Sequence, residues 1–96
     1  MKSVSIVIPN WNGADLLQSF LPSVMEAQKQ YPDLAEIIVV DDASTDDSVQ
    51  LLRKDFPDAK LIVHEKNRGF GKACWSGALA ALHPILKPLR RFNVGW

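Results

Sequence analysis

Cysteine is almost absent from this chain, and its scarcity excludes two kinds of small protein. Cys74 is the single cysteine among 96 residues. One thiol can form neither an internal disulfide nor a cysteine-rich zinc site. Long hydrophobic runs are missing too, since no apolar stretch approaches the roughly 20 residues that span a bilayer. The start of the chain passes from Lys2 directly into a strand-like pattern, without a signal-peptide core. We therefore expect no transmembrane segment and a cytoplasmic location.

The chain also lacks an excess of charge of either sign. Eleven Lys and Arg residues balance eleven Asp and Glu residues, so the formal net charge is zero. A neutral chain presents no overall field that would attract nucleic acid or an anionic membrane, and we expect no nucleic-acid partner. The apolar fraction of 47% is typical of a soluble globular chain. The length fits one small domain or part of a larger one.

The apolar residues fall into two patterns that alternate along the chain. Short runs rich in β-branched residues predict strands, and longer segments with apolar residues at helical spacing predict helices. The expected strands cover residues 4–9, 36–40 and 60–64. The expected helices carry apolar stripes within 16–25, 49–56 and 70–81. This βαβαβα order predicts an α/β fold, with a Rossmann-like parallel sheet of order 3-2-1 flanked by helices.

The second expected strand ends in two carboxylates, Asp41 and Asp42. Open α/β sheets bind their ligands at the carboxyl ends of the strands, so this pair lies where a ligand would bind. Helix capping explains the acidic and hydroxyl residues that follow, with Ser44 or Thr45 as the N-cap and Asp46 in the first turn. No capping role explains both Asp41 and Asp42. We therefore predict that at least one of them contacts a ligand.

A calcium loop is an alternative explanation for this acidic segment, and it fails on position. Counted from Asp42, the sixth and twelfth residues are Asp47 and Arg53. An EF-hand loop requires glycine and glutamate at those two places. Asp47 is better interpreted as a residue that favours the helix dipole.

Two other strand ends carry candidate binding residues. After the first strand, Trp11 could stack on a planar base, or it could simply cover the sheet edge, and the residues leave both open. Asn12 is a plausible N-cap of the helix that follows. After the third strand, the loop from Asn67 to Lys72 could cradle phosphate with its backbone N–H groups. On its own, however, this loop is better explained as an ordinary glycine-containing turn, because it lacks the ending of a P-loop.

Two residues with reactive side chains are assigned to packing. Cys74 lies on the apolar side of the third expected helix, which suits core packing better than nucleophilic chemistry. The same side includes Phe70 and several small residues, which would let this helix approach the sheet closely. His64 ends the third strand without a ligand-spaced partner. We interpret it as a surface or packing residue.

Three blocks taken together, residues 4–13, 36–46 and 67–71, resemble the family-2 glycosyltransferases. The resemblance implies a GT-A fold and an enzyme that transfers a sugar, with inversion, from a nucleotide-diphosphate donor to an acceptor hydroxyl. It implies a UDP- or dTDP-type donor, because Asp42 would contact the base, usually uracil. The nucleotide-binding residues implied by position are Pro9, Trp11, Asp41, Asp42, Asn67, Gly69 and Gly71.

The chain departs from this family beyond Ala81. The family's next strand ends in an Asp-x-Asp motif that holds Mg²⁺ or Mn²⁺, and neither this motif nor the acceptor half with its general base occurs here. The resemblance therefore implies a donor-binding half that is inactive alone, with no catalytic residue and no metal ligand in this chain. The alternatives are a stand-alone nucleotide-binding module and a non-functional gene remnant. The acceptor is not indicated.

The last residues do not continue the alternating pattern. Pro84 and Pro88 interrupt them, and no run there would pass as a fourth strand. We predict a nucleotide-sugar-binding half of a GT-A domain over residues 1–82 and an off-pattern tail over 83–96. A 3-2-1 sheet that stops there leaves its first strand as an unpaired apolar edge, so we expect a truncated GT-A fold.

Overall fold

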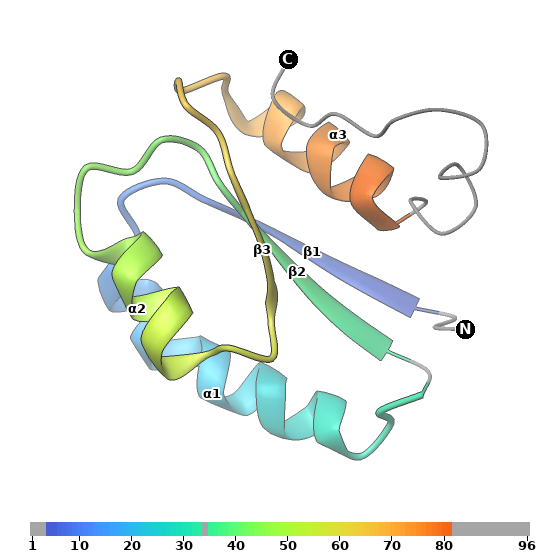
Figure 1. Cartoon of the computed structure of the whole chain (residues 1–96). Helices are drawn as coiled ribbons and strands as arrows, with labels where there is room; N and C mark the ends of the chain where they lie inside the picture. Colours follow the sequence, from blue (N-terminus) through green and yellow to red (C-terminus); the bar gives the residue numbers. More distant parts are fainter. Residues whose placement is uncertain (1–3, 34, 82–96) are drawn as a thin grey trace.

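The computed structural model describes residues 4–33 and 35–81 and shows a parallel sheet between two layers of helices (Figure 1). The tail predicted over residues 83–96 lies outside the described residues. The order of elements is βαβαβα, as predicted. The strands are β1 (Val4–Asn10), β2 (Ala35–Asp41) and β3 (Lys60–Val63), and the helices are α1 (Ala14–Lys29), α2 (Ser48–Asp55) and α3 (Phe70–Ala81).

The sheet has the order β1-β2-β3 with both pairs parallel, which confirms the predicted 3-2-1 order. In register, Asn10 of β1 pairs with Asp41 of β2, and Asp41 pairs in turn with Val63 of β3. The three strands therefore end side by side at one edge of the sheet. The loops that follow them come together at that edge, where ligands of such sheets bind.

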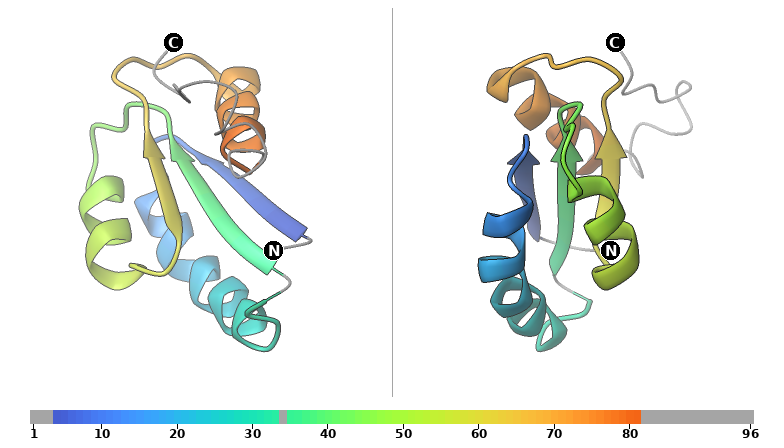
Figure 2. Two further views of the ribbon diagram at one scale, coloured as in Figure 1. Left: turned by 45° about the vertical axis from the view of Figure 1, so that its right-hand side comes forward. Right: turned by 90° about the vertical axis from the view of Figure 1, so that its left-hand side faces the viewer.

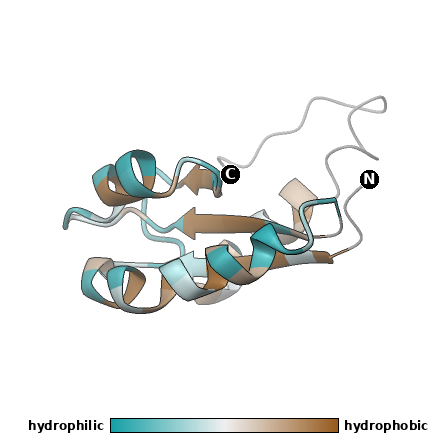
Figure 3. Ribbon diagram, turned by 90° about the horizontal axis from the view of Figure 1, so that it is seen from below, coloured by the Kyte–Doolittle hydropathy of each residue, from teal (hydrophilic) through white to brown (hydrophobic). Residues whose placement is uncertain are grey.

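The helices cover both faces of the sheet. Figure 2 shows α1 and α2 on one face and α3 on the other. Hydrophobic residues gather on the strands, and hydrophilic residues are frequent on the outer faces of α1 and α2 (Figure 3). None of the helices in residues 4–33 and 35–81 combines the length and apolarity needed to cross a bilayer.

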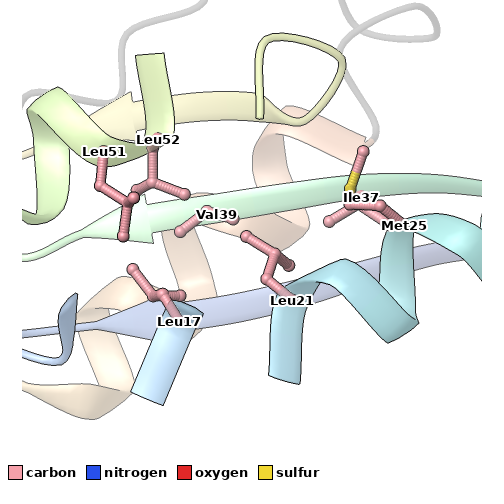
Figure 4. Close-up of a cluster of buried hydrophobic side chains, with 7 residues drawn as sticks. All are labelled: Leu17, Leu21, Met25, Ile37, Val39, Leu51 and Leu52. Carbon is pink, nitrogen blue, oxygen red and sulfur yellow. The ribbon is translucent and has the colours of Figure 1, made fainter. Parts of the chain in front are cut away.

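The central strand β2 is buried on both faces, which explains its uninterrupted apolar run. Its side chains alternate between two clusters, because successive residues of a strand point to opposite faces. Ile38 and Val40 pack with Ile62 and the small residues of α3. On the other face, the side chains drawn in Figure 4 point toward one another from α1, β2 and α2; they are Leu17, Leu21, Met25, Ile37, Val39, Leu51 and Leu52.

Helix α3 approaches the sheet through small residues, as predicted. Its buried positions are Ala73, Ser76, Gly77 and Ala80. A Cβ atom added to Gly77 would overlap the side chain of Val7, so this contact requires glycine. The prediction that Phe70 belongs to the buried side is wrong, because this ring begins the helix and is 74% exposed.

The predicted N-caps of the first two helices are also wrong. Gly13 precedes α1 and Asp47 precedes α2, and neither makes a side-chain capping bond. Asn12 has a left-handed backbone with φ of 51°, which is not the extended conformation of an N-cap. Its side chain reaches across to the next loop instead.

Strand β1 lies at the edge of the sheet, as the predicted order requires. Among the described residues it pairs with β2 alone. Val4 and Ile6 are 53% and 38% exposed, so the edge carries apolar side chains rather than the charges typical of natural edges.

The close approach of α3 leads to a prediction about its two glycines. Gly77→Ala should lower the free energy of unfolding by about 1–3 kcal/mol, because the new methyl group overpacks against Val7. Gly71→Ala is the matched control in the same helix. An added Cβ there meets nothing within 4 Å, so higher helix propensity should raise stability by up to about 1 kcal/mol. Urea denaturation measures both, and equal effects would contradict the close contact.

Candidate functional site

A cleft of about 240 Å³ lies at the carboxyl ends of the strands. Its walls come from three chain segments: the end of β1 with its loop, the residue after β2, and the loop after β3 together with the start of α3. The lining residues are Pro9, Asn10, Trp11, Asp42, Asn67, Gly69, Phe70 and Ala73. Five of the seven predicted nucleotide-binding residues are among them. Asp41 and Gly71 are not.

Asp42 lines this cleft, and protein donors use most of the hydrogen-bonding capacity of its carboxylate. Its Oδ1 accepts from His64 Nδ1 at 2.8 Å and from the main-chain N–H of Arg68 at 2.8 Å. Its Oδ2 accepts from the main-chain N–H of Gly69 at 2.8 Å. The residue is only 4% exposed. Asp42 therefore ties the loop after β3 to the end of β2.

These contacts favour the ionised form of Asp42. Burial alone raises the pKa of its carboxyl group, because it removes water from the charge. Hydrogen bonds from the Arg68 N–H, the His64 ring and the Gly69 N–H outweigh burial and hold the pKa of Asp42 below its usual value of 3.8. A carboxylate that stays charged is a permanent hydrogen-bond acceptor at the cleft.

Asp41 is completely buried and is used within the protein. Its carboxylate accepts from Asn10 Nδ2 at 3.0 Å, from the Ser44 N–H at 2.9 Å and from the Ser44 hydroxyl at 2.7 Å. Between Asp41 and Ser44 in the sequence, Ala43 has a positive φ of 64°, so the chain turns sharply after β2. The structure thus places Asp41 beneath the β2–α2 turn rather than in the cleft. Ser44 supports this turn and does not cap α2, contrary to the prediction.

The loops after β1 and β2 are joined by polar contacts. Asn12 Oδ1 accepts from the Thr45 N–H at 2.7 Å, and the Asn12 N–H donates to Ser44 Oγ at 2.9 Å. Asp46 Oδ1 accepts from the Ser48 N–H at the start of α2 at 2.9 Å, but Asp46 precedes the helix and does not lie in its first turn as predicted. These contacts hold the two loops together on one side of the cleft.

Asp46 also accepts a hydrogen bond from the start of the neighbouring helix α1. Its Oδ2 accepts from the Ala14 N–H at the start of α1, at 3.1 Å. Burial raises the pKa of Asp46, but the hydrogen bonds from Ser48 and Ala14 outweigh it and lower the pKa below its usual value.

His64 is the part of the site that the sequence analysis missed. It is 2% exposed, and its Nε2 lies 2.7 Å from the hydroxyl of Ser76 in α3. The prediction of a surface or packing residue is therefore incomplete, because the ring bridges Asp42 and Ser76. One signal was available: the parallel register that pairs Asp41 with Val63 also places the next residues, Asp42 and His64, together.

Two exposed aromatic rings border the cleft. Trp11 is 59% exposed and Phe70 is 74% exposed, although both are large apolar side chains. Exposed aromatic faces at the end of an α/β sheet are suited to stacking on a planar ligand.

The described acidic residues are not arranged as metal ligands. No group of three or more His, Cys, Asp or Glu side chains in residues 4–33 and 35–81 could hold a metal ion. Protein donors already use three of about four acceptor directions on each of the Asp41 and Asp42 carboxylates. The residues of this cleft therefore do not fit a divalent cation.

The fold and the cleft together define an α/β protein of the Rossmann-like type, with a ligand site at the ends of its parallel strands. Comparison with known sequences gives the family. The profile of "Glycosyl transferase family 2" matches residues 5–86, and the chain belongs to this family.

The similar proteins are glycosyltransferases. The chain is 38% identical over 74 residues to undecaprenyl-phosphate 4-deoxy-4-formamido-L-arabinose transferases of Yersinia pestis and Yersinia pseudotuberculosis. The match covers 75% of this chain and 23% of each relative. A solved mannosyltransferase from Pyrobaculum calidifontis, in complex with GDP-Man and Mn²⁺, superimposes with a TM-score of 0.60 at 28% identity. That match covers 90% of this chain and 24% of the mannosyltransferase, which confirms the GT-A relationship.

The lowered pKa of Asp42 predicts a dependence of stability on pH. A carboxyl group with a lowered folded pKa adds stability above its usual pKa of 3.8, and this is lost as the pH falls through the folded value. Asp42→Asn should therefore lower the free energy of unfolding at neutral pH by about 1–3 kcal/mol. Denaturation from pH 7 to pH 2 should show the difference from the parent shrinking in acid. Asp58→Asn, in the exposed turn after α2, is the control. A loss of unfolding free energy in Asp42→Asn that stays constant from pH 7 to pH 2 would contradict the prediction.

Proposed function

We propose that this chain forms the donor-binding part of a glycosyltransferase, and that its cleft holds the base of a nucleotide-diphosphate sugar. One observation carries the proposal: the strand ends bring an ionised carboxylate and exposed aromatic rings into a single cleft. Membership of glycosyl transferase family 2 supports it. So does the similar mannosyltransferase, which was solved with a nucleotide sugar bound.

In this proposal Asp42 recognises the edge of the base. A carboxylate offers about four acceptor directions, and protein donors use three of them here. The remaining direction, on Oδ2, can accept an N–H from the ligand. Uracil and thymine each present one imide N–H, so a UDP- or dTDP-type donor is the first choice. Guanine also carries a ring N–H, which makes GDP the necessary competitor in any test.

The aromatic rings and the loop after β3 complete the proposed base site. Trp11 stacks on the face of the base, because its ring borders the cleft and is exposed. Pro9 adds apolar wall on the same side. Asn67 and Gly69 also line the cleft, and in this proposal their loop borders the rest of the donor.

The size of the cleft limits what it can hold. At about 240 Å³ it is smaller than the roughly 300–1,000 Å³ of sites that enclose a drug-sized ligand. The described cleft therefore fits the base end of a nucleotide sugar, and the sugar and acceptor require further residues. The chain spans 23% of the length of its curated relatives, in keeping with a partial site.

The chemistry of transfer is not assigned to the described residues. A general base must have a carboxylate free to take the proton of an acceptor hydroxyl. Asp41 is fully buried and bound by protein donors, and the remaining acceptor direction of Asp42 is assigned to the ligand N–H, so neither is given this role. We expect the chain to bind a nucleotide without transferring sugar, and we expect binding of the base to be independent of Mn²⁺.

The experiment is an amide NMR titration of the chain with UDP, dTDP and GDP, with and without Mn²⁺. Saturable shifts of the cleft residues with UDP or dTDP, unchanged by Mn²⁺, are expected. Trp11→Ala should weaken binding about fivefold or more, because base stacking contributes roughly 1–3 kcal/mol. Trp75→Ala is the matched control, since Trp75 is similarly exposed on α3 and does not line the cleft.

Two results would contradict the proposal. A dispersed spectrum that none of the three nucleotides moves would show a folded domain without a base site. Equal losses of affinity in Trp11→Ala and Trp75→Ala would remove the stacking role. Transfer of sugar by the purified chain would overturn the expected inactivity.

A further inference from the structure

The buried ring of His64 connects Asp42, which lines the cleft, to Ser76 in α3. Its Nδ1 lies 2.8 Å from Asp42 Oδ1, and its Nε2 lies 2.7 Å from Ser76 Oγ. His64 and Ser76 are 2% and 0% exposed, so water does not compete for these contacts. The hydrogen-bonded series Asp42–His64–Ser76 thus runs from the end of β2, through the residue after β3, to the middle of α3.

The chemistry of Asp42 and Ser76 determines which atom donates and which accepts in each of these two hydrogen bonds. An ionised carboxylate only accepts hydrogen bonds, so His64 Nδ1 is the donor to Asp42. In the neutral ring Nε2 then accepts from the Ser76 hydroxyl, and in the charged ring it donates to the same oxygen. A hydroxyl group can serve either role, so Ser76 holds the ring in one orientation in both protonation states.

We propose that His64, held by Ser76, is a positioning residue that fixes the orientation of the Asp42 carboxylate. The ring and the Arg68 N–H together direct Oδ1 into the protein. Oδ2 is left with the Gly69 N–H and one free acceptor direction. The effect on ligand affinity rests on the proposed function, whereas the orientation of Asp42 in the free chain does not.

The same contacts couple the cleft walls. Asp42 holds the loop at Arg68 and Gly69, and His64 joins Asp42 to α3, whose first turns carry Phe70 and Ala73. A change in the ring should therefore be felt at Asp42 and in the loop that leads into α3.

The charged groups near the ring are few. Asp42 is the acidic side chain in contact with it, and Ser76 is its partner from α3. The charged residues of the adjoining loop and first turn of α3, which are Glu65, Lys66, Arg68 and Lys72, are exposed. Asp42 is thus the group whose titration reports on the ring.

Two substitutions of His64 separate its two hydrogen bonds. Asparagine places an amide N–H near the position of Nδ1, so His64→Asn keeps the donor to Asp42 and loses the contact with Ser76. Glutamine places its amide near the position of Nε2, so His64→Gln keeps the contact with Ser76 and loses the donor. The amide signals of Arg68 and Gly69, followed by NMR from pH 7 to pH 2, report the titration of Asp42 in each variant.

In His64→Gln we expect the midpoint of this titration to move to higher pH, and the affinity for UDP or dTDP to fall about threefold to tenfold. In His64→Asn we expect a midpoint between those of the parent and His64→Gln, because the amide keeps the donor to Asp42 but loses the coulombic effect of His64, and at least partial recovery of affinity. A His64→Gln midpoint equal to that of the parent would overturn the proposal. So would equal midpoints in the two variants, since a general loss of packing affects both.

Ser76→Ala tests the same proposal with a smaller change, in case a His64 variant does not fold. Removal of the hydroxyl frees the ring, so the Asp42 midpoint should rise, by less than in His64→Gln. Ser19→Ala is the matched control, because its hydroxyl bonds within α1, remote from the cleft. An unmoved midpoint in Ser76→Ala would overturn the role of Ser76. If the midpoints shift as expected while no nucleotide binds the parent, the proposed function fails and the positioning role stands.

Discussion

The hydrogen bonds to the Asp42 carboxylate are the interaction on which the cleft depends. Three donors converge on this group, one from the His64 ring and two from the main chain of the loop after β3. Buried N–H groups that lose their acceptor are costly, so the loop and the end of β2 are held in place together. Through His64 and Ser76 the same carboxylate reaches α3. The end of β2, the loop after β3 and α3 thus share one anchor.

The buried central strand imposes this arrangement. Because β2 is covered on both faces, its residues from Ile37 to Val40 are apolar, and polar side chains follow at Asp41 and Asp42, where the loops meet. Asp41 and Asp42 are adjacent but point to different surroundings, as successive residues of an extended chain do. One supports the β2–α2 turn and the other borders the cleft. This division explains how the acidic pair serves both the fold and a ligand site.

Much of the fold could be predicted from the sequence. The strand and helix order follows from the period of the apolar residues, and the sheet order follows from short right-handed crossovers. The close approach of α3 could be inferred from its small residues, and Gly77 bears this out. The N-caps and Phe70 were predicted wrongly. The ends of helices depend on contacts between loops, such as that of Asn12 with Thr45, which no local pattern contains.

By itself, the sequence determined the alternation of strands and helices, the family, and the strand ends at which a site would form, because these follow from local periodicity and from short blocks of residues. Only the tertiary structure decided which polar groups meet there. Asp42 and His64 are 22 residues apart in the chain, and parallel register brings their side chains to 2.8 Å. Ser76 joins them because glycine lets α3 lie close to the sheet. Such contacts depend on three-dimensional packing, and for that reason His64, without a partner near it in the chain, was interpreted as a packing residue.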